Sequence, residues 1–259
     1  MRKSLVVVVS AALLLLAYTL FHFLSVGIAM GKARTALDGG FPAVAANDLE
    51  KNRSDVVRRK DGCRLLMDTY YASRKADLLE WAAQACLASG QESPEAYLAL
   101  AVSSELRGGD ADALRILDAG TKKFEKTPGL YLKIAQILAR NKNFDDAGNF
   151  YNQAVDKAPD NQNIALEAMQ FFSQIGKDDA AKTLAGKLKG AKTDNPEIKL
   201  LLARALKRGG DVDGAKALIA EANTMMASNA QLKGRLEKIY EDVFKEGKGS
   251  GKPRVPASK

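Results

Sequence analysis

The sequence has few of the side chains on which most enzyme active sites depend. It has a single histidine, His22, and only two cysteines, Cys63 and Cys86. His22 lies in an apolar segment, so the rest of the chain has no histidine for acid–base catalysis or metal binding. The two thiols do not form a CxxC pair, and no GxSxG or P-loop motif occurs. We therefore expect no enzyme activity, no metal site and no cofactor.

Positive charge is in excess, but it is not gathered into a basic face. The chain has 39 Lys and Arg against 31 Asp and Glu. Much of the difference lies at the two ends, and within residues 31–244 the two signs nearly balance. A nucleic-acid-binding domain would show a strong clustered basic face, so nucleic acid is not an expected partner. Residues 245–259, which are rich in Gly, Pro and Lys, are expected to be a disordered basic tail.

Residues 5–30 contain no charged side chain. At about 1.5 Å per residue, a helix of this length can cross a hydrocarbon core of about 30 Å. The apolar part of a secretory signal is only about 7–15 residues long. Residues 1–30 are therefore interpreted as a short cytoplasmic tail and a retained transmembrane anchor, with cleavage after Ala29 or Gly31 as the alternative.

Positive charges flank both ends of this apolar segment. Arg2, Lys3 and the terminal amine precede it, and Lys32 and Arg34 follow it. Positive flanks stay cytoplasmic, so the slight excess before the segment predicts a cytoplasmic N-terminus. The remainder would then lie outside the cytoplasm, in a periplasm or an equivalent compartment. The opposite topology, with a cytoplasmic scaffold, is the alternative.

Residues 94–229 repeat with a period of 34 residues. Each block has two apolar runs separated by a turn such as Gly108-Gly109-Asp110. Glycine tolerates the left-handed backbone that ends a helix, and aspartate caps the next one. A small residue at a fixed place in the second run lets the two helices approach closely. The pattern predicts an all-α fold of stacked helical hairpins with blocks at 94–127, 128–161, 162–195 and 196–229.

The blocks resemble the tetratricopeptide repeat (TPR). The residues of the second block that occupy the signature places of the family are Tyr131, Ile134, Ala135, Leu138, Ala147, Tyr151, Ala154 and Pro159. A weaker block at 60–93 extends the solenoid to residues 60–229. The resemblance implies a right-handed superhelix whose concave groove binds a protein partner as a peptide or helix, and it implies no reaction. Residues 31–59 are expected to be a degenerate helical segment beside the membrane, and residues 230–244 a capping helix.

The face that would line the groove is read from recurring places in the first helix of each block. A leucine stands at the fifth place throughout, and the last block is basic at its far end. A leucine ladder flanked by amides suits an amphipathic helix or an extended peptide. Alternatively, the leucines only join neighbouring repeats and the charges are solvated. The candidate groove residues are Leu98, Val102, Leu132, Gln136, Arg140, Leu166, Gln170, Leu200, Arg204, Lys207 and Arg208.

The two cysteines fall at opposite ends of the weak 60–93 block. Cys63 is near the start of its first predicted helix, and Cys86 is near the end of its second. In an antiparallel hairpin these ends lie side by side, so the two thiols can meet. Outside the cytoplasm this arrangement favours a disulfide. The alternative is two small thiols buried in the core.

A basic stretch precedes this block. It comprises Lys51, Arg53, Arg58, Arg59 and Lys60, and it either contacts anionic lipid or is a solvated loop. The layout as a whole predicts a membrane-tethered scaffold, adaptor or client-holding subunit of an envelope complex. An ancillary subunit of the Sec translocon and several secretion and pilus assembly factors are similar in layout only. An enzyme that uses the repeats to position its substrate is the other class of function considered.

Overall fold

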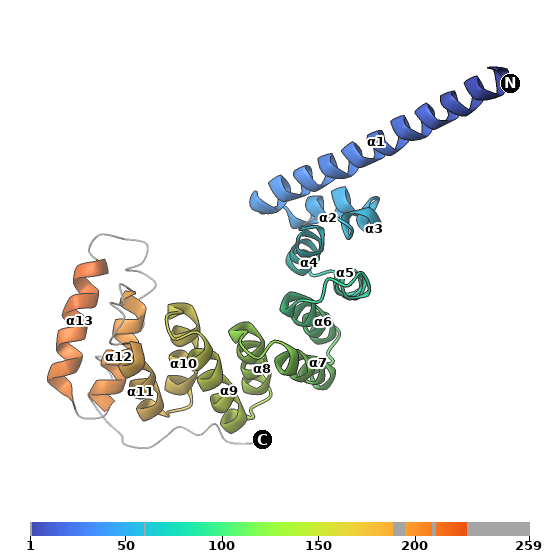
Figure 1. The fold of residues 1–259 in the computed structure, drawn as a ribbon. Helices are drawn as coiled ribbons and strands as arrows, with labels where there is room; N and C mark the ends of the chain where they lie inside the picture. Colours follow the sequence, from blue (N-terminus) through green and yellow to red (C-terminus); the bar gives the residue numbers. More distant parts are fainter. Residues whose placement is uncertain (1, 60, 189–194, 209–210, 227–259) are drawn as a thin grey trace. The chain divides into compact units, whose positions relative to one another are not determined.

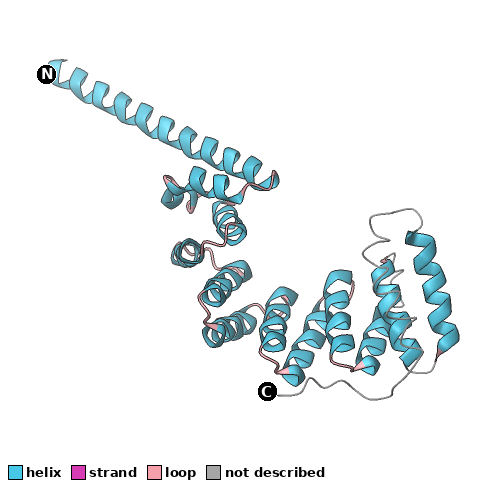
Figure 2. Cartoon of the chain, turned by 180° about the vertical axis from the view of Figure 1, so that it is seen from behind, coloured by secondary structure: helices cyan, strands magenta, loops and turns pink. Residues whose placement is uncertain are grey.

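A computed structural model describes residues 2–59, 61–188, 195–208 and 211–226 of the chain (Figure 1). These residues form helices joined by turns, with no strand among them (Figure 2). The chain divides into two compact units, Met1–Glu125 and Lys126–Lys259. The expected capping helix at 230–244 and the expected tail at 245–259 lie outside the described residues.

The first unit contains seven helices within its described residues. They are α1 (Arg2–Asp38), α2 (Pro42–Glu50), α3 (Arg53–Val56), α4 (Gly62–Ala72), α5 (Ala76–Ala88), α6 (Pro94–Leu106) and α7 (Asp110–Lys123). Those described in the second unit are α8 (Pro128–Arg140), α9 (Phe144–Lys157), α10 (Gln162–Gln174), α11 (Asp178–Leu188), α12 (Pro196–Arg208) and α13 (Val212–Met226). Each unit is therefore built of consecutive antiparallel hairpins, as the repeat predicts.

The helix boundaries keep the period of the sequence. The first helices of the hairpins end at Asp38, Ala72, Leu106, Arg140, Gln174 and Arg208. The second helices begin at Pro42, Ala76, Asp110, Phe144, Asp178 and Val212. Both series advance by a step of about 34 residues, the length of one repeat. The end of α1 and the whole of α2 therefore occupy the place of one further hairpin before the 60–93 block.

The turn between the paired helices uses one left-handed residue at a constant place. The described residues in this place are Gly40, Arg74, Gly108, Lys142 and Gly176, with φ angles of 80°, 55°, 81°, 62° and 75°. A residue in this conformation satisfies the free carbonyls at the end of the preceding helix. Glycine takes it without strain, whereas arginine and lysine take it at a cost of roughly 1 kcal/mol or more. The left-handed turn is thus conserved between hairpins even where Arg74 or Lys142 replaces glycine.

Helix starts are capped at a second constant place. Ser93 accepts a hydrogen bond from the Ala96 amide, and Asn161 accepts one from the Ile164 amide, both at 3.3 Å. Asn195 accepts one from the Glu197 amide at 2.9 Å. These side chains satisfy backbone donors that the first turn of a helix leaves unpaired. The caps fix where α6, α10 and α12 begin.

The second helix of each hairpin packs closely on its neighbours through one buried position. It is occupied by Ala45, Leu79, Ala113, Ala147, Ala181 and Ala215, none more than 2% exposed. The core of the first unit includes side chains from the end of α1, from α2 and from α4 and α5. In the second unit Phe171 lies at the centre of an aromatic group, with its ring centroid 4.7 Å from that of Tyr151 and 5.2 Å from that of Phe172.

Candidate functional site

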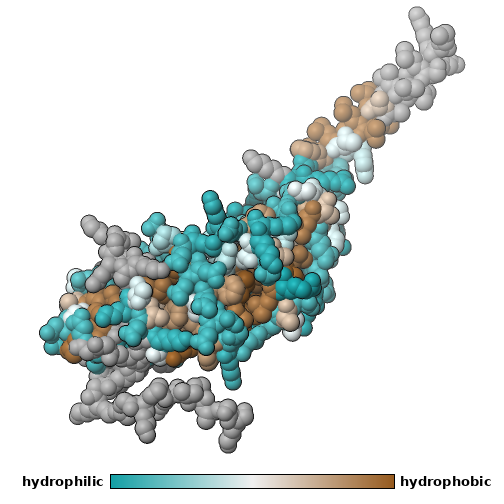
Figure 3. Space-filling model, turned by 60° about the horizontal axis from the view of Figure 1, so that its bottom comes forward, coloured by the Kyte–Doolittle hydropathy of each residue, from teal (hydrophilic) through white to brown (hydrophobic). Residues whose placement is uncertain are grey.

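The N-terminal half of α1 is exposed and apolar. Residues 12–21 are all exposed, and Leu14 and Phe21 reach 71% and 72%. On the face seen in Figure 3 this part of α1 is coloured as hydrophobic. Among the described residues, the 27-residue segment Ala12–Asp38 is long and apolar enough to cross a membrane, with a mean hydropathy of 2.0 over an 18-residue stretch of it. A signal sequence has the same features.

The environment of α1 changes at His22. From this residue onward one side of the helix is covered, because Val26, Met30 and Ala33 are buried in the core that α1 shares with α2 and α4. Figure 1 shows α2 and α3 beside the second half of α1. The opposite side stays bare, since Leu24 and Ile28 are 55% and 60% exposed. Residues 12–21 of α1 thus stay exposed, whereas the second half of the helix packs against α2 and α4.

Charged side chains in and just after α3 contact α1 at His22 and Phe23. The Asp55 carboxylate lies 3.7 Å from Nε2 of His22. Arg59 donates a 2.8 Å hydrogen bond to the carbonyl of Phe23, and its guanidinium lies 3.5 Å from the centroid of the Phe23 ring. A cation over an aromatic ring contributes about 0.5–1 kcal/mol at an exposed site. We call His22, Phe23, Asp55, Arg58 and Arg59 the collar.

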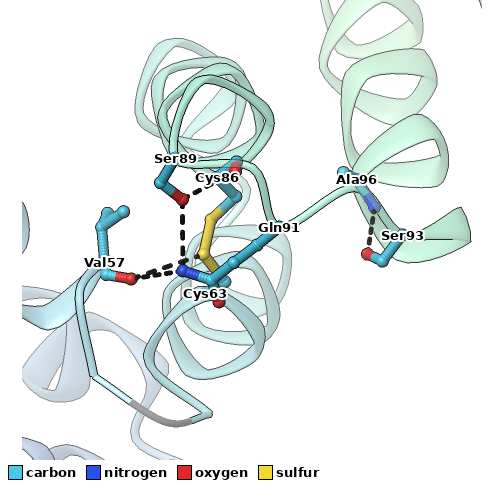
Figure 4. The surroundings of a disulfide bond; sticks show 7 residues. All are labelled: Val57, Cys63, Cys86, Ser89, Gln91, Ser93 and Ala96. Carbon is cyan, nitrogen blue, oxygen red and sulfur yellow. Dashed lines mark hydrogen bonds between the residues drawn. A yellow bond between two sulfur atoms is a disulfide. The ribbon is translucent and has the colours of Figure 1, made fainter.

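The two cysteines form a disulfide between α4 and α5 (Figure 4). Cys63 is 7% exposed, Cys86 is fully buried, and their Cα atoms lie 5.8 Å apart. Beside them, the Gln91 side chain donates a 2.8 Å hydrogen bond to the carbonyl of Val57, just after α3. The disulfide therefore joins α4 and α5 at the end of their hairpin that lies near Val57. The pairing of the two cysteines is the one expected for an antiparallel hairpin.

On the second unit, the first helices of neighbouring hairpins are joined by amide–carboxylate bonds. Gln136 of α8 donates a 2.8 Å hydrogen bond to Glu167 of α10. Gln170 of α10 donates one of 2.8 Å to Glu197 of α12. Bonds of this kind, with one charged partner, contribute about 1.5–3 kcal/mol each. The amides predicted to flank a leucine ladder are therefore already engaged between repeats.

Tyr151 of α9 adds a second donor to Glu167. Its hydroxyl lies 3.2 Å from the same carboxylate oxygen that Gln136 contacts. Burial of the ring raises the pKa of Tyr151 well above its ordinary value of 10.0, and the charge of Glu167 and the hydrogen bond raise it further. The phenol therefore stays a donor at any physiological pH, and Glu167 links three helices.

The candidate groove residues fall into distinct classes. Leu132 and Leu166 are half-buried on α8 and α10, whereas Leu200 is completely buried on α12. Leu200 therefore packs between helices, whereas Leu132 and Leu166 keep part of their surface exposed. Leu98 and Val102 are half-buried on α6 of the first unit. Arg140 is exposed, Arg204 and Lys207 are half-buried, and the side chain of Arg208 lies outside the described residues.

Sequence reasoning missed Glu167, Glu197 and the contacts of Arg59. Glu167 stands 31 residues after its partner Gln136, and Glu197 stands 27 residues after Gln170. Neither separation is the repeat period, so aligning the blocks does not pair them. Their carboxylates add acidic groups that were not among the candidate groove residues. Within the described part of the chain, no group of three or more His, Cys, Asp and Glu is placed to hold a metal ion.

Comparison with known proteins gives structural matches only. No model of a protein family and no curated protein matches the sequence. The C-terminal part of a TPR repeat-containing protein from Cytophaga hutchinsonii is similar in structure, with a TM-score of 0.61 and 16% identity over 82% of this chain and 85% of that one.

Two further structures are similar. A crystal structure of MamA gives a TM-score of 0.52 at 15% identity, covering 64% of this chain and 97% of that one. A structure of Naa15/Naa10 bound to HypK gives 0.53 at 14% identity, covering 74% of this chain and 31% of that one. Identities this low show a shared fold alone. The chain therefore has the tetratricopeptide-repeat fold, a solenoid of helical hairpins preceded by one apolar helix.

Proposed function

We propose that this chain is a membrane-tethered module that binds another protein. It acts as a scaffold, adaptor or client-holding subunit of an envelope complex such as a secretion, pilus or translocon-type assembly. The observation that carries the proposal is the face made by α8 and α10, where half-buried Leu132 and Leu166 lie beside the Gln136–Glu167 bond. This face combines an apolar strip with fixed polar groups, which is what a bound helix or extended peptide needs.

The chemistry of this face favours an amphipathic peptide. Half-buried leucines offer apolar contact, and Arg140 at the end of α8 carries a positive charge on the same helix as Leu132. The Gln136 and Gln170 amides are held in place by carboxylates, so little side-chain freedom is lost when a partner binds. The expected partner therefore presents apolar side chains at helical or alternating spacing, with an acidic group toward Arg140.

The tether and its orientation rest on α1 and on the disulfide. The exposed apolar residues of α1 before His22 are suited to contact with lipid. The Cys63–Cys86 bond is of a kind that persists outside the cytoplasm. The proposal thus has a cytoplasmic N-terminus, one membrane span and the repeats on the far side of the membrane. No catalytic role is part of it, since the described residues offer capped turns and repeat contacts rather than a nucleophile with a base.

Site-specific crosslinking tests the binding face. A photoreactive amino acid is placed at Leu132 or Leu166, and, as the matched control, at the exposed Gln153 of α9. We expect one defined protein adduct from positions 132 and 166 in membranes and none from position 153. The substitution Leu166→Lys should abolish the adduct formed at 132. Equal adducts at all three positions, or none at 132 and 166, would refute this binding face.

A further inference from the structure

We propose that the collar marks the depth at which the chain sits in the bilayer, and that its arginines bind anionic lipid headgroups. The proposal rests on the proposed membrane tether and goes beyond it. It ends the membrane span at Phe21 rather than at Met30, and it assigns residues 22–38 to the aqueous side. Three independent observations on the first unit lead to it.

The first observation is the pattern of burial along α1. Residues 12–21 are exposed on every side, so no other described part of the chain packs around this stretch. His22 is the first described residue after this stretch that is not fully exposed, and Val26 is completely buried by protein. A helix cannot pack against α2 and α4 and be surrounded by lipid at the same level. The change from lipid to protein neighbours therefore falls at His22.

The second observation is the charge at this level. Asp55 lies 3.7 Å from His22, and Arg59 contacts both the carbonyl and the ring of Phe23. Ionised side chains are excluded from the hydrocarbon unless they reach the interface. An aspartate and an arginine fixed against residues 22 and 23 therefore place these residues in the headgroup layer. The aromatic ring of Phe23 under the guanidinium suits the same layer.

The third observation is the repeat register. The left-handed turn residue Gly40 and the helix start at Pro42 are in phase with those of the later hairpins. The second half of α1 is thus the first helix of a repeat hairpin, with Met30 and Ala33 in its core. A repeat hairpin that continues the core of α4 and α5 belongs with the water-soluble solenoid. The anchor and the solenoid share one uninterrupted helix.

The remaining span is long enough to cross a thin bilayer. Residues 5–21 extend about 25 Å at about 1.5 Å per residue, close to the lower limit for a membrane helix. Arg2 and Lys3 precede this stretch in the sequence, as positively charged residues that flank a membrane helix do. Leu24 and Ile28 lie on the bare side of α1, away from the core. When the helix tilts by about 20°, Leu24 on this side lies near the acyl boundary, while the collar side stays among headgroups and Ile28 stays on the aqueous side.

The basic side chains around α3 are arranged to meet phosphates. The Arg58 side chain is 79% exposed, and its contact with Asp55 is a loose 3.8 Å. Arg53 stacks 4.4 Å over the ring of Trp81, which holds its guanidinium in place, and Lys51 is exposed beside it. Asp55 is shared between His22 and Arg58, and Glu50 and Asp61 are exposed acids at the two ends of this stretch. The segment is therefore net basic. The planar guanidinium of arginine can donate two parallel hydrogen bonds to the oxygens of one phosphate.

Fluorescence quenching in lipid vesicles tests the depth. Full-length Ser54→Cys carries a fluorophore at an exposed site in α3, and Ala119→Cys on α7 serves as the matched control. Each is reconstituted in phosphatidylcholine vesicles that contain a lipid with a nitroxide on its headgroup. We expect strong quenching at position 54 and almost none at position 119. Vesicle flotation without quenching at 54 overturns the collar assignment. Failure to float overturns the membrane tether itself.

A second arm tests the headgroup preference. Replacing part of the phosphatidylcholine by phosphatidylglycerol should raise the quenching at position 54 further, and added salt should reverse the increase. Arg58→Gln with Arg59→Gln should remove the increase while flotation is retained. Arg58→Gln alone, at a surface position, should remove part of it without any effect on folding. Equal quenching in both lipids, or an unchanged increase in both variants, would overturn the assignment of anionic headgroups.

Discussion

Gln136 and Tyr151 donate hydrogen bonds to the same oxygen of Glu167, at 2.8 Å and 3.2 Å. This carboxylate therefore joins α8, α9 and α10, which belong to two consecutive hairpins. A similar bond between Gln170 and Glu197 joins the next pair of first helices. The polar groups beside the half-buried leucines thus hold the repeats together and set the shape of the proposed binding face at the same time.

Loss of the Glu167 carboxylate should destabilise the second unit. Glu167→Ala leaves the Gln136 amide and the Tyr151 hydroxyl without their partner in a half-buried place. We expect a loss of about 2 kcal/mol, since a buried donor left unsatisfied costs about 1–3 kcal/mol. Chemical unfolding followed by circular dichroism measures it. Asp160→Ala, at an exposed turn position, is the control and should change little. Equal effects of the two substitutions would contradict this role.

The raised pKa of Tyr151 gives stability a defined dependence on alkaline pH. The unfolded phenol ionises near its ordinary pKa of 10.0, whereas the folded phenol holds its proton to a higher pH. Its contribution is therefore complete below pH 10.0 and falls as the pH rises above it. Tyr151→Phe should cost about 1 kcal/mol near neutral pH. The difference in free energy of unfolding between Tyr151→Phe and the unmodified chain should become smaller as the pH rises above the ordinary pKa.

Unfolding curves recorded across this range test the sign of the effect. Tyr71→Phe, which removes a phenol from an exposed position, provides the comparison. A gap between Tyr151→Phe and the unmodified chain that stays constant with pH would show that burial of the phenol has no effect on its ionisation.

Removal of the disulfide should weaken the first unit. In Cys63→Ala with Cys86→Ala, the loop between the two positions is free in the unfolded chain. The loop-entropy account gives a loss of about 3 kcal/mol. The single tryptophan, Trp81, lies on α5 between the two positions and reports unfolding of this unit by fluorescence. Reduction of the unmodified chain should give the same shift, and a Trp81 transition unaffected by both treatments would contradict the prediction.

Ala147, one of the small residues at the constant buried position, should not tolerate a larger side chain. Ala147 on α9 is fully buried, so Ala147→Leu must push the helices of its hairpin apart. Overpacking of this kind costs about 1–3 kcal/mol. Thermal unfolding measures the loss, with Gln153→Leu at an exposed place on the same helix as the control. Equal transition temperatures in the two variants would refute the close packing.

Most of the hairpin architecture could be predicted from the sequence because its determinants are local. Turn residues such as Gly108 and Gly176 and cap residues such as Ser93 and Asn161 recur at fixed places, and they set the helix ends by themselves. The pairing of Cys63 with Cys86 followed from the same hairpin geometry.

The first hairpin was only partly predicted, because its first helix continues an apolar segment. The hydrophobicity of residues 5–30 hides the buried positions Val26 and Met30, which look like further lipid-facing residues. The bond between Gln136 and Glu167 was missed because it depends on how neighbouring hairpins stack. The contact of Arg59 with Phe23 likewise joins residues 36 apart through tertiary packing that no local pattern encodes.

The central claim, a membrane-tethered solenoid outside the cytoplasm, is tested most directly by thiol labelling of Cys63 and Cys86 in cells. A membrane-impermeant maleimide is applied to the full-length chain with and without prior reduction, and the Cys63→Ser variant is the control. The account predicts that the unmodified chain is labelled only after reduction, without any need to permeabilise the membrane. Labelling that needs no reduction, but only after the membrane is opened, would place the repeats in the cytoplasm and contradict the account.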